Sequence, residues 1–131
     1  MMKANEGNPP IRVLLADDSG IMLRAISRLL DGTPEIALVG VAGNFEEAVR
    51  LADELQPQIV ILDLRMAQRA NANALRLKAQ QRGLRLLAIT AASVNDDESV
   101  ALANAIGADK LLDKMTLDEA LIPAILELAG N

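Results

Sequence analysis

Residues 59–63 read Ile-Val-Ile-Leu-Asp, a run of four large apolar residues that ends at a carboxylate. Consecutive apolar positions predict a strand covered on both faces, as in the middle of a parallel sheet. Three other apolar runs also end at or near a polar side chain: residues 14–16 at Asp17 and Asp18, residues 86–89 at Thr90, and residues 111–112 near Lys114. Open α/β sheets bind ligands at the edge where the carboxyl ends of parallel strands meet. The four runs therefore predict a reaction centre at one edge of a sheet.

Short apolar runs alternate with segments of helical period along the chain, which predicts repeated βαβ units and an α/β fold. The expected strands are residues 11–17, 36–41, 59–62, 85–90 and 110–114. Three helix starts are indicated by capping-box spacing, at Asn44 with Glu47, Asn95 with Glu98, and Thr116 with Glu119. Residues 69–82 are expected to supply the third helix after an initial loop, because Ala and Asn dominate the start of this segment.

Length and composition favour one domain with one aliphatic core. The chain has 131 residues, 51% of them hydrophobic, and Phe45 is its single aromatic residue. Residues 1–10 read as a polar tail and residues 11–131 as the domain. The net charge of −5 argues against direct binding of nucleic acid, which needs a basic surface. The absence of Cys and His excludes disulfides, the usual zinc sites and imidazole triads.

The sequence contains no membrane-spanning stretch and no signal-peptide core, so a cytoplasmic protein without membrane contact is expected.

Gathering Asp17, Asp18 and Asp63 at one edge requires a compensating cation. Carboxylates about 5 Å apart repel by a few kcal/mol at an effective dielectric constant near 20. Oxygen ligands without His or Cys point to a hard divalent ion, and Mg²⁺ suits a few carboxylates that leave room for a phosphoryl group. A carboxylate can itself be the nucleophile in phosphoryl transfer, and Asp63 is the candidate. Lys114 and Thr90 could stabilise the charge that develops on the phosphoryl oxygens.

In sequence context, these residues lie in Leu-Ala-Asp-Asp-Ser (Asp17 and Asp18), Ile-Leu-Asp-Leu-Arg-Met (Asp63), Ile-Thr-Ala-Ala (Thr90) and Gly-Ala-Asp-Lys-Leu-Leu-Asp-Lys (Lys114). From Ile11 to Ala129 the chain resembles a response-regulator receiver domain of the two-component and chemotaxis type. The resemblance implies a doubly wound, flavodoxin-like fold, with a five-stranded parallel sheet of order 2-1-3-4-5 flanked by five helices.

The resemblance also implies a role for each site residue. Asp63 would accept a phosphoryl group from a histidine kinase or a histidine phosphotransfer protein. The implied Mg²⁺ ligands are Asp18, Asp63 and the backbone carbonyl of Arg65, with Asp17 acting through bound water. The implied contacts to the phosphoryl oxygens are Thr90, the backbone of Ala91, and Lys114. Such a domain is a switch and not a turnover enzyme.

The expected output of the switch is a change in the face formed by the fourth helix, fifth strand and fifth helix, which would bind a downstream effector. A phosphorylation-linked homodimer is a further expectation.

Several positions depart from the pattern of many receivers, among them Met115, which follows Lys114 where a proline is frequent. Ala67 and Asn71 stand where a proline and a glycine are frequent, which predicts a late start of the third helix. Leu111 stands where an aromatic residue often swings inward on activation, so the coupling to a partner is expected to differ.

Ordinary explanations exist for each residue taken alone. Asp17 and Asp18 could cap a helix, Asp63 could belong to a turn, and Lys114 could be a solvated charge. Their joint placement at the ends of separate strands favours a shared site. Two other hypotheses are a receiver-shaped interaction module that works without phosphate, and a Mg²⁺-dependent phosphohydrolase. Only a final helix is expected after Lys114, which leaves a stand-alone receiver or the receiver part of a longer, DNA-binding regulator.

Overall fold

The computed structural model describes residues 9–70 and 83–130. Five parallel strands form one sheet in the order β2-β1-β3-β4-β5. Their bounds are β1 Ile11–Ala16, β2 Ile36–Ala42, β3 Ile59–Asp63, β4 Arg85–Thr90 and β5 Lys110–Asp113. The helices are α1 Gly20–Asp31, α2 Phe45–Leu55, α3 Leu64–Ala70, α5 Asp97–Ala105 and α6 Leu117–Gly130, with a 3₁₀ turn η2 at Lys114–Thr116. The predicted doubly wound α/β sheet and its strand order are confirmed.

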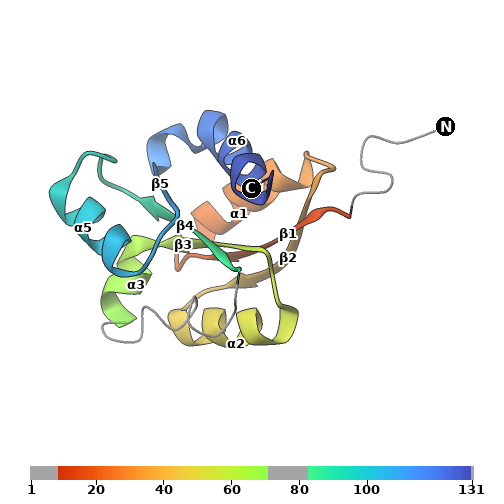
Figure 1. Cartoon of the computed structure of the whole chain (residues 1–131), viewed down its shortest axis with the longest axis horizontal. Coiled ribbons are helices and arrows are strands. Elements are labelled where there is room, and N and C mark those ends of the chain that lie inside the picture. The colour runs from red at the N-terminus through yellow and green to blue at the C-terminus, as the bar shows by residue number, and fades with distance from the viewer. Residues whose placement is uncertain (1–8, 71–82, 131) are drawn as a thin grey trace.

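Helices cover both faces of the sheet, with α1 and α6 on one side and α2, α3 and α5 on the other (Figure 1). The central strand β3 is buried along its whole length. Its side chains alternate between the two faces, so that Val60 and Leu62 join the core under α2, α3 and α5, while Ile59 and Ile61 join the core under α1 and α6. This double burial explains the unbroken apolar run that the sequence shows.

Side-chain caps start most of the helices. Ser19 Oγ accepts a hydrogen bond from the Met22 amide at the start of α1. Asn44 Oδ1 accepts one from the Glu47 amide at 2.8 Å, which confirms the predicted cap of α2.

The predicted cap of the fourth helix is one residue off. Asp96, and not Asn95, caps α5. Its Oδ2 atom accepts a hydrogen bond from the Ser99 amide at 2.9 Å. At the last helix, α6 begins at Leu117 as the spacing predicts. The predicted capping box is not found among the described residues, because Thr116 instead donates its hydroxyl hydrogen bond to Asp113 Oδ1.

The start of α3 differs most from the sequence-based expectation. The helix begins at Leu64, directly after the last residue of β3, whereas the sequence predicts a loop that continues into the start of residues 69–82 and a late helix start. Leu64, Met66 and Ala67 are buried, so packing favours the helix where the apolar period seemed weak. Ala67 also leaves Met66 free to be helical, which a proline after it would disfavour. Residues 71–82 and the first eight residues of the expected polar tail lie outside the described residues.

Among the described residues, no helix combines the length and the apolar character needed to cross a membrane.

Candidate functional site

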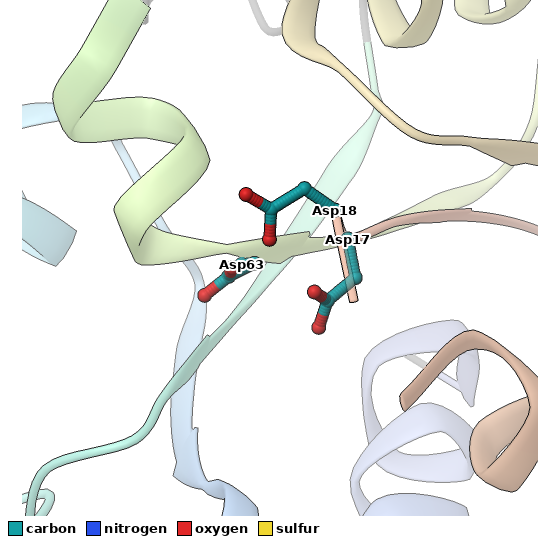
Figure 2. Close-up of side chains that lie close together, drawn as sticks. All are labelled: Asp17, Asp18 and Asp63. Carbon is teal, nitrogen blue, oxygen red and sulfur yellow. The ribbon is translucent and has the colours of Figure 1, made fainter. Parts of the chain in front are cut away.

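Three carboxylates meet at the carboxyl edge of the sheet (Figure 2). Asp17 and Asp18 directly follow β1, and Asp63 is the last residue of the neighbouring strand β3. One oxygen from each lies within 4.8 Å of the others. Asp17 and Asp63 are almost fully buried, and Asp18 keeps 34% of its side chain exposed. The structure therefore brings together the three acids that the sequence singled out.

Backbone amides fix the two buried carboxylates. Asp17 Oδ1 accepts a hydrogen bond from the Ser19 amide at 2.9 Å, and Asp63 Oδ1 accepts one from the Arg65 amide at 3.3 Å. Asp63 Oδ2 is buried and accepts no hydrogen bond from the described residues, whereas the buried Asp17 Oδ2 faces the ammonium group of Lys114. Each carboxylate is thus anchored through one oxygen and presents the second to the site.

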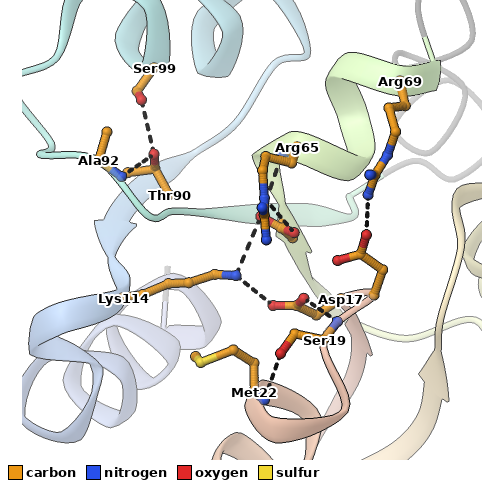
Figure 3. Close-up of polar contacts among 11 residues, drawn as sticks. Asp17, Ser19, Met22, Arg65, Arg69, Thr90, Ala92, Ser99 and Lys114 are labelled. Carbon is orange, nitrogen blue, oxygen red and sulfur yellow. Dashed lines mark hydrogen bonds and ion pairs between the residues drawn. The ribbon is translucent and has the colours of Figure 1, made fainter.

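Lys114 links the two buried carboxylates. Its Nζ atom lies 3.0 Å from Asp17 Oδ2 and 3.6 Å from Asp63 Oδ1 (Figure 3). The residue opens η2 directly after β5, at the same edge of the sheet. A single ammonium group therefore neutralises part of the charge of two acids, as the sequence-based hypothesis requires.

Two arginines of α3 also lie beside the carboxylates, and the sequence analysis did not predict that they pair with these acids. Arg65 Nε lies 3.9 Å from Asp63 Oδ2, and Arg69 pairs through Nη2 with Asp18 Oδ2 (Figure 3). Residues four apart share one face of a helix, so the Arg65–Arg69 spacing was a usable signal. It was overlooked because this stretch was expected to be a loop. Each of the three carboxylates thus has a side-chain cation beside it.

The surroundings of Asp63 and Asp18 shift the pKa values of these two carboxylates in opposite directions. Burial raises the pKa of Asp63, the nearby charge of Asp17 raises it further, and Lys114 opposes both effects. The hydrogen bond from Arg69 lowers the pKa of Asp18.

Thr90 lies at the end of β4, and its hydroxyl group contacts α5. Its Oγ1 lies 2.9 Å from Ser99 Oγ on α5 and accepts a hydrogen bond from the Ala92 amide at 3.1 Å (Figure 3). Within the described part of the chain, no hydrogen bond joins Thr90 to Asp63. Ser99 was not singled out from the sequence, and a lone serine on a helix offers no signal for this contact.

A pocket of about 690 Å³ opens beside this hydrogen bond, between α3 and α5. Arg65, Thr90 and Ala91 are among the residues that line it. Leu111 is half-buried on β5 and packs against the core under α5.

Comparison with protein families gives one match over most of the chain. The response regulator receiver domain family matches residues 13–126. The chain belongs to this family. The site just described therefore lies at the edge of a receiver sheet, and the family resemblance inferred from the sequence is confirmed.

Relatives and solved structures agree with this assignment. The receiver is 34% identical over 106 residues to protein-glutamate methylesterase/protein-glutamine glutaminase 3 of Geobacter sulfurreducens, covering 81% of this chain and 28% of that protein. It is 31% identical over 122 residues to the nitrate/nitrite response regulator protein NarL of Escherichia coli, covering 93% of this chain and 56% of that protein. The response regulator domain of Thermotoga maritima CheB superposes with a TM-score of 0.79 at 24% identity, covering 93% and 98% of the two chains. The receiver thus spans only part of the length of these curated relatives.

The three carboxylates of the receiver fit a divalent cation. All candidate ligands are oxygens, and Asp63 Oδ2 is buried without a hydrogen-bond donor among the described residues. Oxygens on opposite sides of Mg²⁺ lie about 4.2 Å apart, since each Mg–O distance is about 2.1 Å. The three carboxylate oxygens, all within 4.8 Å of one another, span a similar width.

Proposed function

We propose that this receiver is a phosphoacceptor switch in which Asp63 takes a phosphoryl group from a histidine kinase or a histidine phosphotransfer protein. The observation that carries the proposal is the buried Asp63 carboxylate held beside Asp17, Asp18 and Lys114 at the carboxyl edge of the sheet. Isolated buried carboxylates are costly and are retained where they have chemistry to perform. Two buried carboxylates that share one ammonium group, beside the partly exposed Asp18, favour a reaction in which a divalent cation takes part.

In the proposed reaction, an Asp63 oxygen attacks the phosphorus and the bond from phosphorus to the donor's histidine nitrogen breaks. An acyl phosphate forms on Asp63. Lys114 already lies 3.6 Å from Asp63 Oδ1 and is placed to contact the phosphoryl oxygens. The Arg65 amide donates to the same Asp63 oxygen and keeps the carboxylate oriented.

Asp18, Asp63 and, through water, Asp17 would hold Mg²⁺, with the Arg65 carbonyl as a further ligand. The ion supplies positive charge that offsets the charge of the transferred group. Arg65 is the second residue of α3, and helical carbonyls point along the axis toward the C-terminal end. Use of this carbonyl therefore requires the first turn of α3 to adjust.

The proposed switch runs through Thr90 and the Ala91 backbone. Thr90 would leave Ser99 and turn toward the phosphoryl oxygens, which changes how the β4–α5 connection meets α5. The output face would be formed by α5, β5 and α6. Leu111 on β5 cannot report the change as an aromatic ring would, so we assign the output to the movement of α5. The phosphorylated face could bind an effector or a second copy of the receiver.

The test is labelling with a small phosphodonor and Mg²⁺, followed by mass measurement of the intact protein. We expect one added phosphoryl group in the wild type and none in Asp63→Asn. Asp53→Asn is a matched control, because Asp53 is an exposed acid on α2. Label retained by Asp63→Asn would refute the proposal.

One observation favours a second candidate, an interaction module that works without phosphate: the charges of the site are already paired within the chain. The same experiment separates the two functions. A wild type that takes up no label from donor and Mg²⁺, while remaining folded, would favour the interaction module.

A further inference from the structure

We propose that Arg69 is a built-in competitor for the divalent cation at Asp18. Its guanidinium group donates a hydrogen bond to Asp18 Oδ2, and binding of the cation to this carboxylate displaces it. This inference rests on the metal site of the proposed function and adds a residue that sets the affinity of that site.

The position of Arg69 follows from the early start of α3. Because the helix begins at Leu64, Arg69 lies within its seven residues and one turn beyond Arg65. Residues four apart are separated by about 6 Å along the axis and lie on the same face. Arg65 therefore reaches Asp63 while Arg69 reaches over to Asp18 (Figure 3). A helix that started several residues later would not present the two side chains together.

The contact itself is specific. Arg69 Nη2 donates to Asp18 Oδ2, although the two residues are 51 positions apart in the sequence. Asp18 is the one member of the three acids that is partly exposed, with 34% of its side chain accessible, and is therefore the acid an entering ion would meet first.

Charge accounting supports competition. The three carboxylates carry about three negative charges, and Lys114, Arg65 and Arg69 bring three positive charges beside them. A divalent cation would enter a site whose charge is already balanced. Removing one guanidinium leaves an uncompensated carboxylate, which attracts a divalent ion more strongly.

Arg69 is easier to displace than Lys114. Its side chain is 61% exposed, whereas Lys114 is 11% exposed and contacts two buried acids. Exposed ion pairs are weak because water and salt screen them. Arg69 can therefore move into solvent, while Lys114 stays with Asp17 and Asp63.

The test is a Mg²⁺ titration of the unphosphorylated receiver, followed by the amide resonances of residues 17, 18 and 63. Arg69→Gln keeps a long polar side chain without the charge, and we expect it to bind Mg²⁺ about three- to fivefold more tightly than the wild type. Arg50→Gln is the matched control, because it removes the same charge from an exposed arginine of α2 that pairs with Glu47 and Glu54. This control should bind as the wild type does. Asp18→Asn should bind Mg²⁺ more weakly than the wild type and than either arginine variant.

Two outcomes would overturn the inference, and they differ in what they say about the site. If Arg69→Gln binds Mg²⁺ no more tightly than the wild type, while Asp18→Asn binds it more weakly, the metal site is supported and the competition by Arg69 is refuted. If none of the four proteins binds Mg²⁺, the metal site of the proposed function falls, and the competition falls with it. The dispersion of the amide spectrum shows in each case that the variant is folded.

Discussion

Asp63 and Asp18 have oxygens within 4.8 Å of each other, yet their surroundings shift their pKa values in opposite directions. Asp63 is 1% exposed and faces the charge of Asp17, so the folded protein binds its proton more tightly than the unfolded chain does. Asp18 is partly exposed and paired with Arg69, so the folded protein binds its proton less tightly. Ionised Asp63 therefore opposes folding, whereas ionised Asp18 favours it.

Substitution of each aspartate by asparagine should show these opposite effects on the free energy of unfolding, measured in metal-free buffer with a chelator. The stability associated with the raised pKa of Asp63 is present below the unfolded value and is lost as pH rises through the folded value. Asp63→Asn should therefore be more stable than the wild type at pH 7, by on the order of 1 kcal/mol, and the advantage should shrink toward acid pH. Urea unfolding at several pH values measures the difference.

Asp18→Asn is the control with the opposite sign. The lowered pKa of Asp18 contributes stability above the unfolded value, which is lost as pH falls through the folded value. This variant should be less stable than the wild type at pH 7 and equal to it in acid. A loss of stability at pH 7 in Asp63→Asn would show that Lys114 and the Arg65 amide outweigh burial and the charge of Asp17.

Among the helices, α6 carries a proline in its interior. Pro123 is the seventh residue of this helix and is exposed, while Leu121, Ala124 and Ile125 on the same helix are buried. Proline has no amide proton and removes the hydrogen bond to the carbonyl four residues earlier, here that of Glu119. Packing of the apolar face therefore holds α6 on the sheet despite a locally unfavourable residue.

Pro123→Ala should stabilise the receiver, because it restores one helical hydrogen bond without changing the buried face of α6. The penalty for proline inside a helix is about 3 kcal/mol, and we expect a gain of about 1–3 kcal/mol in the free energy of unfolding. Urea unfolding followed by far-ultraviolet circular dichroism measures it. Labelling of Asp63 should be unchanged, since Pro123 lies outside the site. A variant less stable than the wild type would mean that the ring of Pro123 makes packing contacts that outweigh the bond.

The helices also show how far sequence patterns reach at this scale. The cap at Asn44 was predictable because side-chain caps depend on residues three apart in the sequence. The early start of α3 was not, because it depends on the burial of Leu64, Met66 and Ala67 against other elements. For the same reason the pairing of Arg69 with Asp18 could not be predicted, since this contact across 51 residues depends on where the helix starts.

At the scale of the whole molecule, the sheet edge was the most predictable feature. Each strand had to end where its apolar run ended, and parallel pairing then placed Asp17, Asp18, Asp63 and Lys114 together. Thr90 also ends its strand as predicted, but its side chain turns to Ser99, because a hydroxyl can rotate to whichever partner is near. The sequence could therefore predict the positions of the site residues, but it could not predict which partner each side chain takes.

Binding of Mg²⁺ at this edge should stabilise the entire domain, because the unfolded chain has no preformed cluster of carboxylates. A ligand that binds only the folded state adds about 1.4 kcal/mol at ten times its dissociation constant, which is a rise of about 5 °C in Tm for a domain of this size. Thermal unfolding followed by circular dichroism is the suitable measurement, since the chain has no Trp or Tyr.

Sodium chloride at matched ionic strength is the control for screening. Asp18→Asn should lose most of the rise, because Asp17 and Asp63 alone leave the open side of the site without a ligand. An equal rise in Asp18→Asn and the wild type would place the stabilising ion elsewhere on the receiver.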